Sequence, residues 1–222
     1  MSFKIWVFIA IGLFGIGIVL GLTVTGVIAD LLSEEIAALE GLAAILVPFK
    51  ISTAVFILLK NTSSLLLSFI FSPVFCLLPV LALTVNGGLL SFISAVIIHE
   101  KSLGFLLAGL LPHGIFELPA LIIGEAAALS FGAMVVVLLF RHGWSLVTSF
   151  VIKGKARILL IPALLTIVGI FPSIIILALL DPQTRPLVIE NLKQNAWYLV
   201  VACLLLVPAA IIETFVTPLF LT

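Results

Sequence analysis

The chain has 222 residues, of which 64% are hydrophobic and 9% are charged, and its ten basic and ten acidic side chains balance. Soluble domains have about 45–50% apolar and about 25% charged residues, so this chain has too little polar surface to cover a globule in water. The composition excludes a soluble enzyme, a disulfide scaffold and a disordered tail, and the zero net charge excludes a nucleic-acid-binding protein.

The first apolar stretch, 5–29, contains no charged residue and exceeds the roughly 20 residues that a membrane-spanning helix needs. It is too long for the apolar part of a cleaved signal peptide, so we expect a retained anchor. The next segment, 30–49, has apolar residues at helical spacing and acidic residues mostly on the other face. This pattern predicts an amphipathic helix that lies at the membrane surface.

A second span is predicted at 62–85. We expect kinks rather than breaks at Pro73 and Pro79, because membrane helices tolerate proline when neighbouring groups satisfy the freed carbonyls. The sequence Asn86-Gly87-Gly88 that follows is typical of a turn.

The region that follows is divided into short apolar pieces. Residues 89–98 and 103–111 are each about half the length of a membrane crossing, whereas 115–140 is long enough to cross. We therefore expect broken or re-entrant half-helices around 89–118. Irregular backbone of this kind is stable at membrane depth only when it is buried in protein or lines a water-filled cavity.

Two further spans are predicted at 158–180 and 197–212. The loop 141–157 has four basic residues and no acidic one, which places it in the cytoplasm by the positive-inside rule. The expected architecture is an all-α, polytopic bundle of about six membrane segments in the cell membrane, with 1–222 as one domain. Both termini are cytoplasmic if 89–111 crosses the membrane once. A re-entrant hairpin there would change the number of crossings by one, so one of the predicted placements would fail.

Five ionisable residues stand out because loops and helix ends do not explain them. His113, Glu117 and Glu125 lie in apolar sequence, with His99 and Glu100 close by. An ionised carboxylate at the bilayer centre costs about 2.5–3.5 kcal/mol, so such groups face a protein interior or a cavity. We predict that these five residues form a polar intramembrane site.

The geometry of this site depends on where its helix begins. If the helix begins at Pro112, His113 and Glu117 lie on one face, four residues apart. If it begins at Pro119, residues 112–118 form a loop and Glu117 lies near a helix N-terminus.

Three roles stay open for the site. The first is a structural network that holds the broken helices together. The second is a proton relay or a metal site, and the third is a catalytic site. The candidate metal ligands are His113, Glu117 and Glu125. Familiar intramembrane protease motifs are incomplete: His99-Glu100, for example, lacks the second histidine of a zinc-protease motif, because Leu103 stands there. We assign no catalytic residue, and this metal ion is the one candidate cofactor.

A stripe of small residues marks the first span. Gly17 and Gly21 are spaced for close helix contact, either with another helix of the chain or with a second copy in a homodimer.

The sequence Pro112-His113-Gly114-Ile115-Phe116-Glu117-Leu118-Pro119-Ala120, with Asn86-Gly87 upstream and Gly124 downstream, resembles the stage II sporulation protein M family. The resemblance covers roughly residues 60–140. It implies an integral membrane protein with His113 and Glu117 as the signature histidine and glutamate. The implied structural positions are Asn86, Gly87, Pro112, Gly114 and Pro119. Glu125 departs from the small residue expected after Gly124.

The resemblance also implies a role. The namesake in spore-forming bacteria is a membrane scaffold that anchors peptidoglycan-degrading partners and has no known enzymatic activity. We therefore expect a non-enzymatic scaffold or assembly protein whose partners are the lipid membrane, other membrane or envelope proteins, or a second copy. The alternatives are a transporter-like or channel-like protein with a cavity beside His113 and Glu117, and a metal-dependent intramembrane enzyme.

Overall fold

The computed structural model describes residues 2–23, 48–152, 175–176, 178–179 and 181–220, with the backbone alone for 142–152. Five helices in this part are long and apolar enough to cross a membrane. They are α1 (Phe3–Thr23), α4 (Ile51–Phe71), α5 (Leu77–Glu100), α6 (Leu103–Ile152) and α9 (Arg185–Phe215), and the 3-10 helix η1 (Thr217–Phe220) follows. The prediction of an all-α bundle is thereby confirmed for the described residues.

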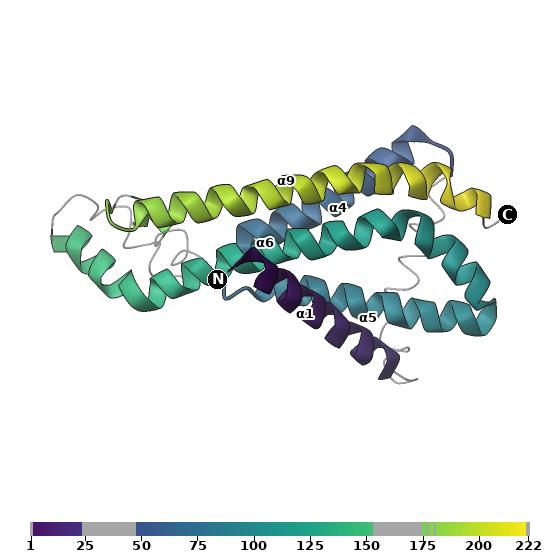
Figure 1. The fold of residues 1–222 in the computed structure, drawn as a ribbon, viewed down its shortest axis with the longest axis horizontal. Coiled ribbons are helices and arrows are strands. Elements are labelled where there is room, and N and C mark those ends of the chain that lie inside the picture. The colour runs from purple at the N-terminus through teal and green to yellow at the C-terminus, as the bar shows by residue number, and fades with distance from the viewer. Residues whose placement is uncertain (1, 24–47, 153–174, 177, 180, 221–222) are drawn as a thin grey trace.

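The helix α6 lies at the centre of the bundle. It packs along α9, with α4 against both, while α1 and α5 form a pair that contacts α6 from another side (Figure 1). In an apolar 18-residue stretch of each helix, 61% of the residues are buried in α6, against 17% in α1 and 17% in α5. Two apolar clusters meet on α6, one containing Phe131 with Leu206 of α9, and one containing Leu129 with Leu83 of α5.

Outward-facing apolar side chains are widespread on the other helices. Phe8 of α1 is 72% exposed and Ile51 of α4 is 75% exposed. A water-soluble bundle would bury such residues, so these surfaces indicate a protein that is surrounded by lipid.

The small-residue stripe of α1 packs against α5 of the same chain. A Cβ atom on Gly17 would overlap the backbone carbonyl of Thr84, and one on Gly21 would overlap that of Gly88. In return, a Cβ on Gly87 would overlap the carbonyl of Phe14. Of the two partners predicted for the stripe, the structure shows the intramolecular one, so the stripe gives no support to a homodimer.

The predicted turn at Asn86-Gly87-Gly88 is wrong, because α5 continues through these residues from Leu77 to Glu100. The glycines serve helix contact instead, since a missing side chain lets the backbone of α1 approach. In consequence, 89–98 is the second half of a full-length helix rather than a separate half-helix.

The chain does break between α4 and α5, where a single span 62–85 was predicted. Residues 72–76 form a turn that contains Pro73, and Phe75 and Cys76 adopt positive φ angles of 51° and 55°. Pro73 thus follows the end of α4 instead of kinking a helix, and its missing N–H interrupts no helical hydrogen bond there. Pro79 lies in the first turn of α5, where its missing N–H costs little.

Downstream, α6 is continuous from Leu103 to Ile152 and contains both Pro112 and Pro119. The predicted half-helix 103–111 is therefore the first part of a longer helix, and re-entrant segments are not observed in the described residues. The N-terminal part of α6 runs at an angle to the rest (Figure 1). Two prolines explain this bend, because each removes a backbone donor and displaces the preceding turn.

The remaining predicted segments can be compared with the structure only where its described residues cover them. Most of the amphipathic segment 30–49 and most of the span 158–180 lie outside the described residues, so the count of six is not tested. Helix α6 runs to Ile152, well into the predicted loop 141–157. Helix α9 already begins at Arg185, within the connector predicted at 181–195, and its apolar part contains the predicted span 197–212.

Candidate intramembrane polar site

His113 and Glu117 lie together on one face of α6. Because the helix runs through Pro112, the two residues are one turn apart, and His113 Nε2 lies 3.7 Å from Glu117 Oε2. The first of the two predicted geometries, with the pair four residues apart inside a helix, is the observed one. The His113 side chain is 14% exposed and that of Glu117 is 34% exposed, so His113 is mostly buried and Glu117 is partly buried.

A third acidic residue, Glu213 near the end of α9, completes this group. One nitrogen or oxygen atom from each of His113, Glu117 and Glu213 lies within 4.8 Å of the other two. Sequence reasoning missed Glu213, because the last predicted span stopped at residue 212. The available signal was a carboxylate directly after a long apolar run, although nothing in its local sequence shows that it faces α6.

Side chains from two other elements hold the pair in place. Asn61 of α4 donates a hydrogen bond from Nδ2 to Glu117 Oε1 at 3.0 Å. Thr217 Oγ1, in η1, lies 3.3 Å from His113 Nδ1. The polar site thus joins α4, α6, α9 and η1. Except for the His113–Glu117 pair within α6, these hydrogen-bond contacts join residues that are at least 56 positions apart in the sequence.

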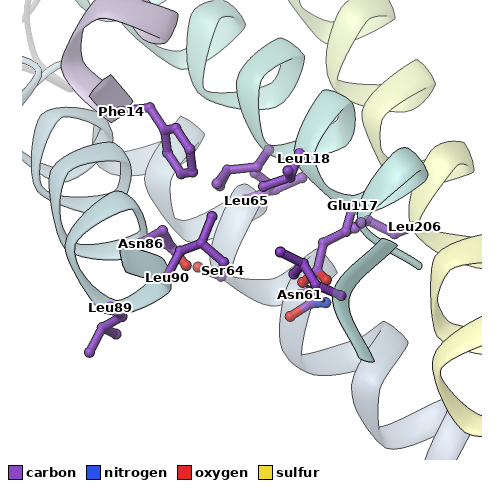
Figure 2. Close-up of a pocket in the computed structure, with 13 residues that line it drawn as sticks. Phe14, Asn61, Ser64, Leu65, Asn86, Leu89, Leu90, Glu117, Leu118 and Leu206 are labelled. Atoms are coloured by element: carbon purple, nitrogen blue, oxygen red, sulfur yellow. Dashed lines mark hydrogen bonds between the residues drawn. The ribbon is translucent and has the colours of Figure 1, made fainter. Parts of the chain in front are cut away.

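A pocket of about 220 Å³ lies beside this group (Figure 2). Asn61 and Glu117 point toward each other at one side of it, and Phe14 of α1 lies on the other. Ser64 and Asn86 add polar atoms to a lining that is otherwise mostly apolar. The arrangement offers a small chamber with a few polar groups in its wall, large enough for a few water molecules or an ion.

Glu125 is separate from this group. It is fully buried, accepts a hydrogen bond of 2.5 Å from Ser68 of α4, and its Oε1 has no hydrogen-bond partner among the described residues. Eight residues along a helix amount to about 12 Å, so Glu125 lies about two turns beyond Glu117. The carboxylate that lies beside His113 and Glu117 is therefore that of Glu213, whereas Glu125, predicted as a candidate ligand, lies apart from the pair.

His99 and Glu100 are also separate. Both are exposed at the C-terminal end of α5. In the described part of the chain, neither forms a hydrogen bond or ion pair with His113 or Glu117. Their polarity therefore reflects a helix end, and the predicted five-residue site reduces to His113 and Glu117 with new neighbours.

The predicted structural motif has several functions in the fold. Gly87 permits the contact with α1, while Asn86 lines the pocket and donates to the carbonyl of Ala82, 2.7 Å away. Gly114 is buried and also lines the pocket. Pro112 and Pro119 lie on either side of the His113–Glu117 pair within α6.

Comparison with known proteins adds one finding. The family model described as Stage II sporulation protein M matches residues 10–218, which is nearly the whole chain. Searches of curated proteins and of solved structures returned no match.

Proposed function

Because the chain belongs to the stage II sporulation protein M family, we propose that it is a non-enzymatic scaffold that crosses the cell membrane several times. Its partner in this proposal is another membrane or envelope protein. The observation that carries the proposal is that the polar side chains of the site contact one another across helices. Glu117 is held by Asn61 of α4 and faces His113 of its own helix, so its carboxylate is engaged in joining helices.

A rigid bundle with apolar outer faces suits this role. Helices that are fixed to one another by polar contacts present a constant surface to a partner, and a scaffold needs such preorganisation more than it needs a reactive group. Exposed apolar side chains on α1, α4 and α9 supply area for docking within the membrane. The segment 30–60 is the other region through which a partner could dock.

The transporter-like and enzymatic alternatives stay predictions. Transport requires a path for solute across the bilayer, whereas the pocket beside Glu117 has a volume of about 220 Å³. A chamber of that size suits a local network of water or a single ion.

Site-specific photocrosslinking in native membranes tests the scaffold role. A photoreactive residue is placed at exposed positions on three helices, Phe8, Ile51 and Trp197, with buried Ala10 of α1 as the matched control. We expect the same second protein in adducts from at least one exposed face, verified by purification in the reverse direction. Ala10 should give no such adduct. Recovery of self-adducts alone from all three exposed positions would contradict the proposal.

A further inference from the structure

We propose that His113, Glu117 and Glu213 bind a divalent transition-metal ion, with Zn²⁺ as the best-suited probe. One ligand atom from each residue lies within 4.8 Å of the others, and the residues come from two helices that pack along each other. An imidazole nitrogen with two carboxylate oxygens is a mixed donor set that favours zinc and similar ions over Mg²⁺. This inference is independent of the scaffold role, since it concerns what closes the contact between α6 and α9.

The orientation of His113 supports a shared ligand. Its Nδ1 lies 3.3 Å from Thr217 Oγ1, while its Nε2 faces Glu117 Oε2 at 3.7 Å, too far for a hydrogen bond. When Nδ1–H donates to Thr217, the Nε2 lone pair is directed toward a carboxylate oxygen, and a cation between the two atoms relieves this repulsion. Metal-binding histidines typically donate their other ring N–H in this way.

The orientation of Glu117 supports the same conclusion. Asn61 donates a hydrogen bond to Glu117 Oε1 at 3.0 Å. The other carboxylate oxygen, Oε2, does not take part in this bond and faces His113. Such an outer hydrogen bond fixes a carboxylate for coordination by its second oxygen. Asn61 is thus a positioning residue for the proposed site.

The distances are compatible with coordination. Zinc binds nitrogen and oxygen at about 2.0–2.2 Å, which places tetrahedral ligand atoms about 3.4 Å apart. The three groups would draw together by at most about 1.4 Å, which side-chain rotation supplies. Glu117 and Gly114 line the pocket, so the chamber gives access to the site and space for a fourth ligand.

The charge balance also favours a cation. Glu117 and Glu213 bring two carboxylates together inside an apolar bundle, which is costly without compensating charge. Lys60 of α4 attracts the carboxylate of Glu213, but the lysine side chain is exposed and supplies a single positive charge for two carboxylates. A bound divalent ion would compensate both carboxylates and fasten the end of α9 to α6.

Metal analysis of the full-length protein in mild detergent tests the proposal. Protein purified without chelators is equilibrated with Zn²⁺, freed of excess metal, and examined for zinc content and thermal unfolding. The variants are His113→Ala and Glu213→Gln, and the control is the double variant His99→Ala/Glu100→Gln. The control removes a histidine and a glutamate from the exposed end of α5.

We expect stoichiometric zinc and a higher Tm with Zn²⁺ than with Mg²⁺ in the wild type and the control. Both site variants should bind zinc at least about tenfold more weakly and lose the Tm shift. If the site variants do not fold, Co²⁺ absorption of the wild type decides. Nitrogen and oxygen ligation gives bands without the thiolate charge-transfer signal expected from Cys76 or Cys203. Folded wild type without zinc, equal zinc in Glu213→Gln, or a thiolate signal would overturn the proposal.

Discussion

Glu117 and Glu125 lie on the same helix, but their surroundings differ. Glu117 has an amide donor from α4 and an imidazole beside it, and it borders a pocket. Glu125 is fully buried and receives one hydrogen bond, from Ser68. A buried carboxyl group with a single donor depends strongly on that donor, because losing it leaves the group without compensation in an apolar environment.

This dependence predicts a large effect of a small substitution. We expect Ser68→Ala to lower the free energy of unfolding by about 1–3 kcal/mol, because the carboxyl group of Glu125 loses its partner. The double variant Ser68→Ala/Glu125→Met should recover part or all of that loss, since both members of the polar pair are then apolar. Reversible unfolding in detergent micelles measures both values. Equal stability of wild type and Ser68→Ala would show that the hydrogen bond contributes nothing.

At the residue level, the sequence indicated His113 and Glu117 because charged groups are costly in an apolar stretch. Their pairing followed once α6 proved continuous. The same reasoning grouped Glu125, His99 and Glu100 with them, and these residues lie elsewhere, because nearness in sequence does not determine which helix a side chain faces. Asn61 and Glu213 were missed, since their relation to Glu117 and His113 exists only through packing of α4 and α9 on α6.

The pair α1–α5 shows how two helices associate without polar contacts at their centre. Gly17 and Gly21 of α1 and Gly87 of α5 let the backbones approach to a distance that any side chain would prevent. By contrast, a Cβ atom on Gly12 or Gly15 of the same helix would meet no atom of another described element within 4 Å. The glycines of α1 therefore divide into a packed set and an open set.

This division gives a test with an internal control. Gly17→Ala should destabilise the protein by about 1–3 kcal/mol, because its Cβ would overlap the rigid carbonyl of Thr84. Gly12→Ala should be neutral or stabilising by up to about 1 kcal/mol, through helix propensity alone. Unfolding measurements on the two variants suffice. Equal effects of both substitutions would contradict the observed α1–α5 contact.

Element boundaries were the part of the fold that the sequence predicted least well. Glycine pairs and proline–glycine clusters are typical of turns in water, and that rule placed a turn at 86–88 and separated the apolar pieces 103–111 and 115–140. In a membrane bundle the same residues serve other purposes, since glycine permits close packing and a proline bends a helix without ending it. Pro73 does follow a helix end, and its local sequence does not distinguish it from Pro112.

At the scale of the whole molecule, two kinds of contact hold α6 in place. On one side, α1 and α5 contact α6 through an apolar cluster that joins Ala10 and Leu83 to Leu129 of α6. On the other, α4 and α9 meet α6 through the polar groups Asn61, Glu117, His113 and Glu213, in addition to apolar packing. His113 and Glu117 thus lie where three helices converge. The free-energy cost of placing them in an apolar chain is offset by a more specific association of these helices.

A double-mutant cycle between Asn61 and Glu117 tests this central claim most directly. Asn61→Ala, Glu117→Ala and the double variant are unfolded reversibly in bicelles, and the pair Asn61 with Glu100, which lies at the exposed end of α5, is the control. We predict a coupling of about 0.6–1.7 kcal/mol for Asn61–Glu117, between the average and the largest value typical of hydrogen bonds between membrane helices, and additive effects for the control. Additive effects of Asn61→Ala and Glu117→Ala would contradict the claim that this contact joins α4 to α6.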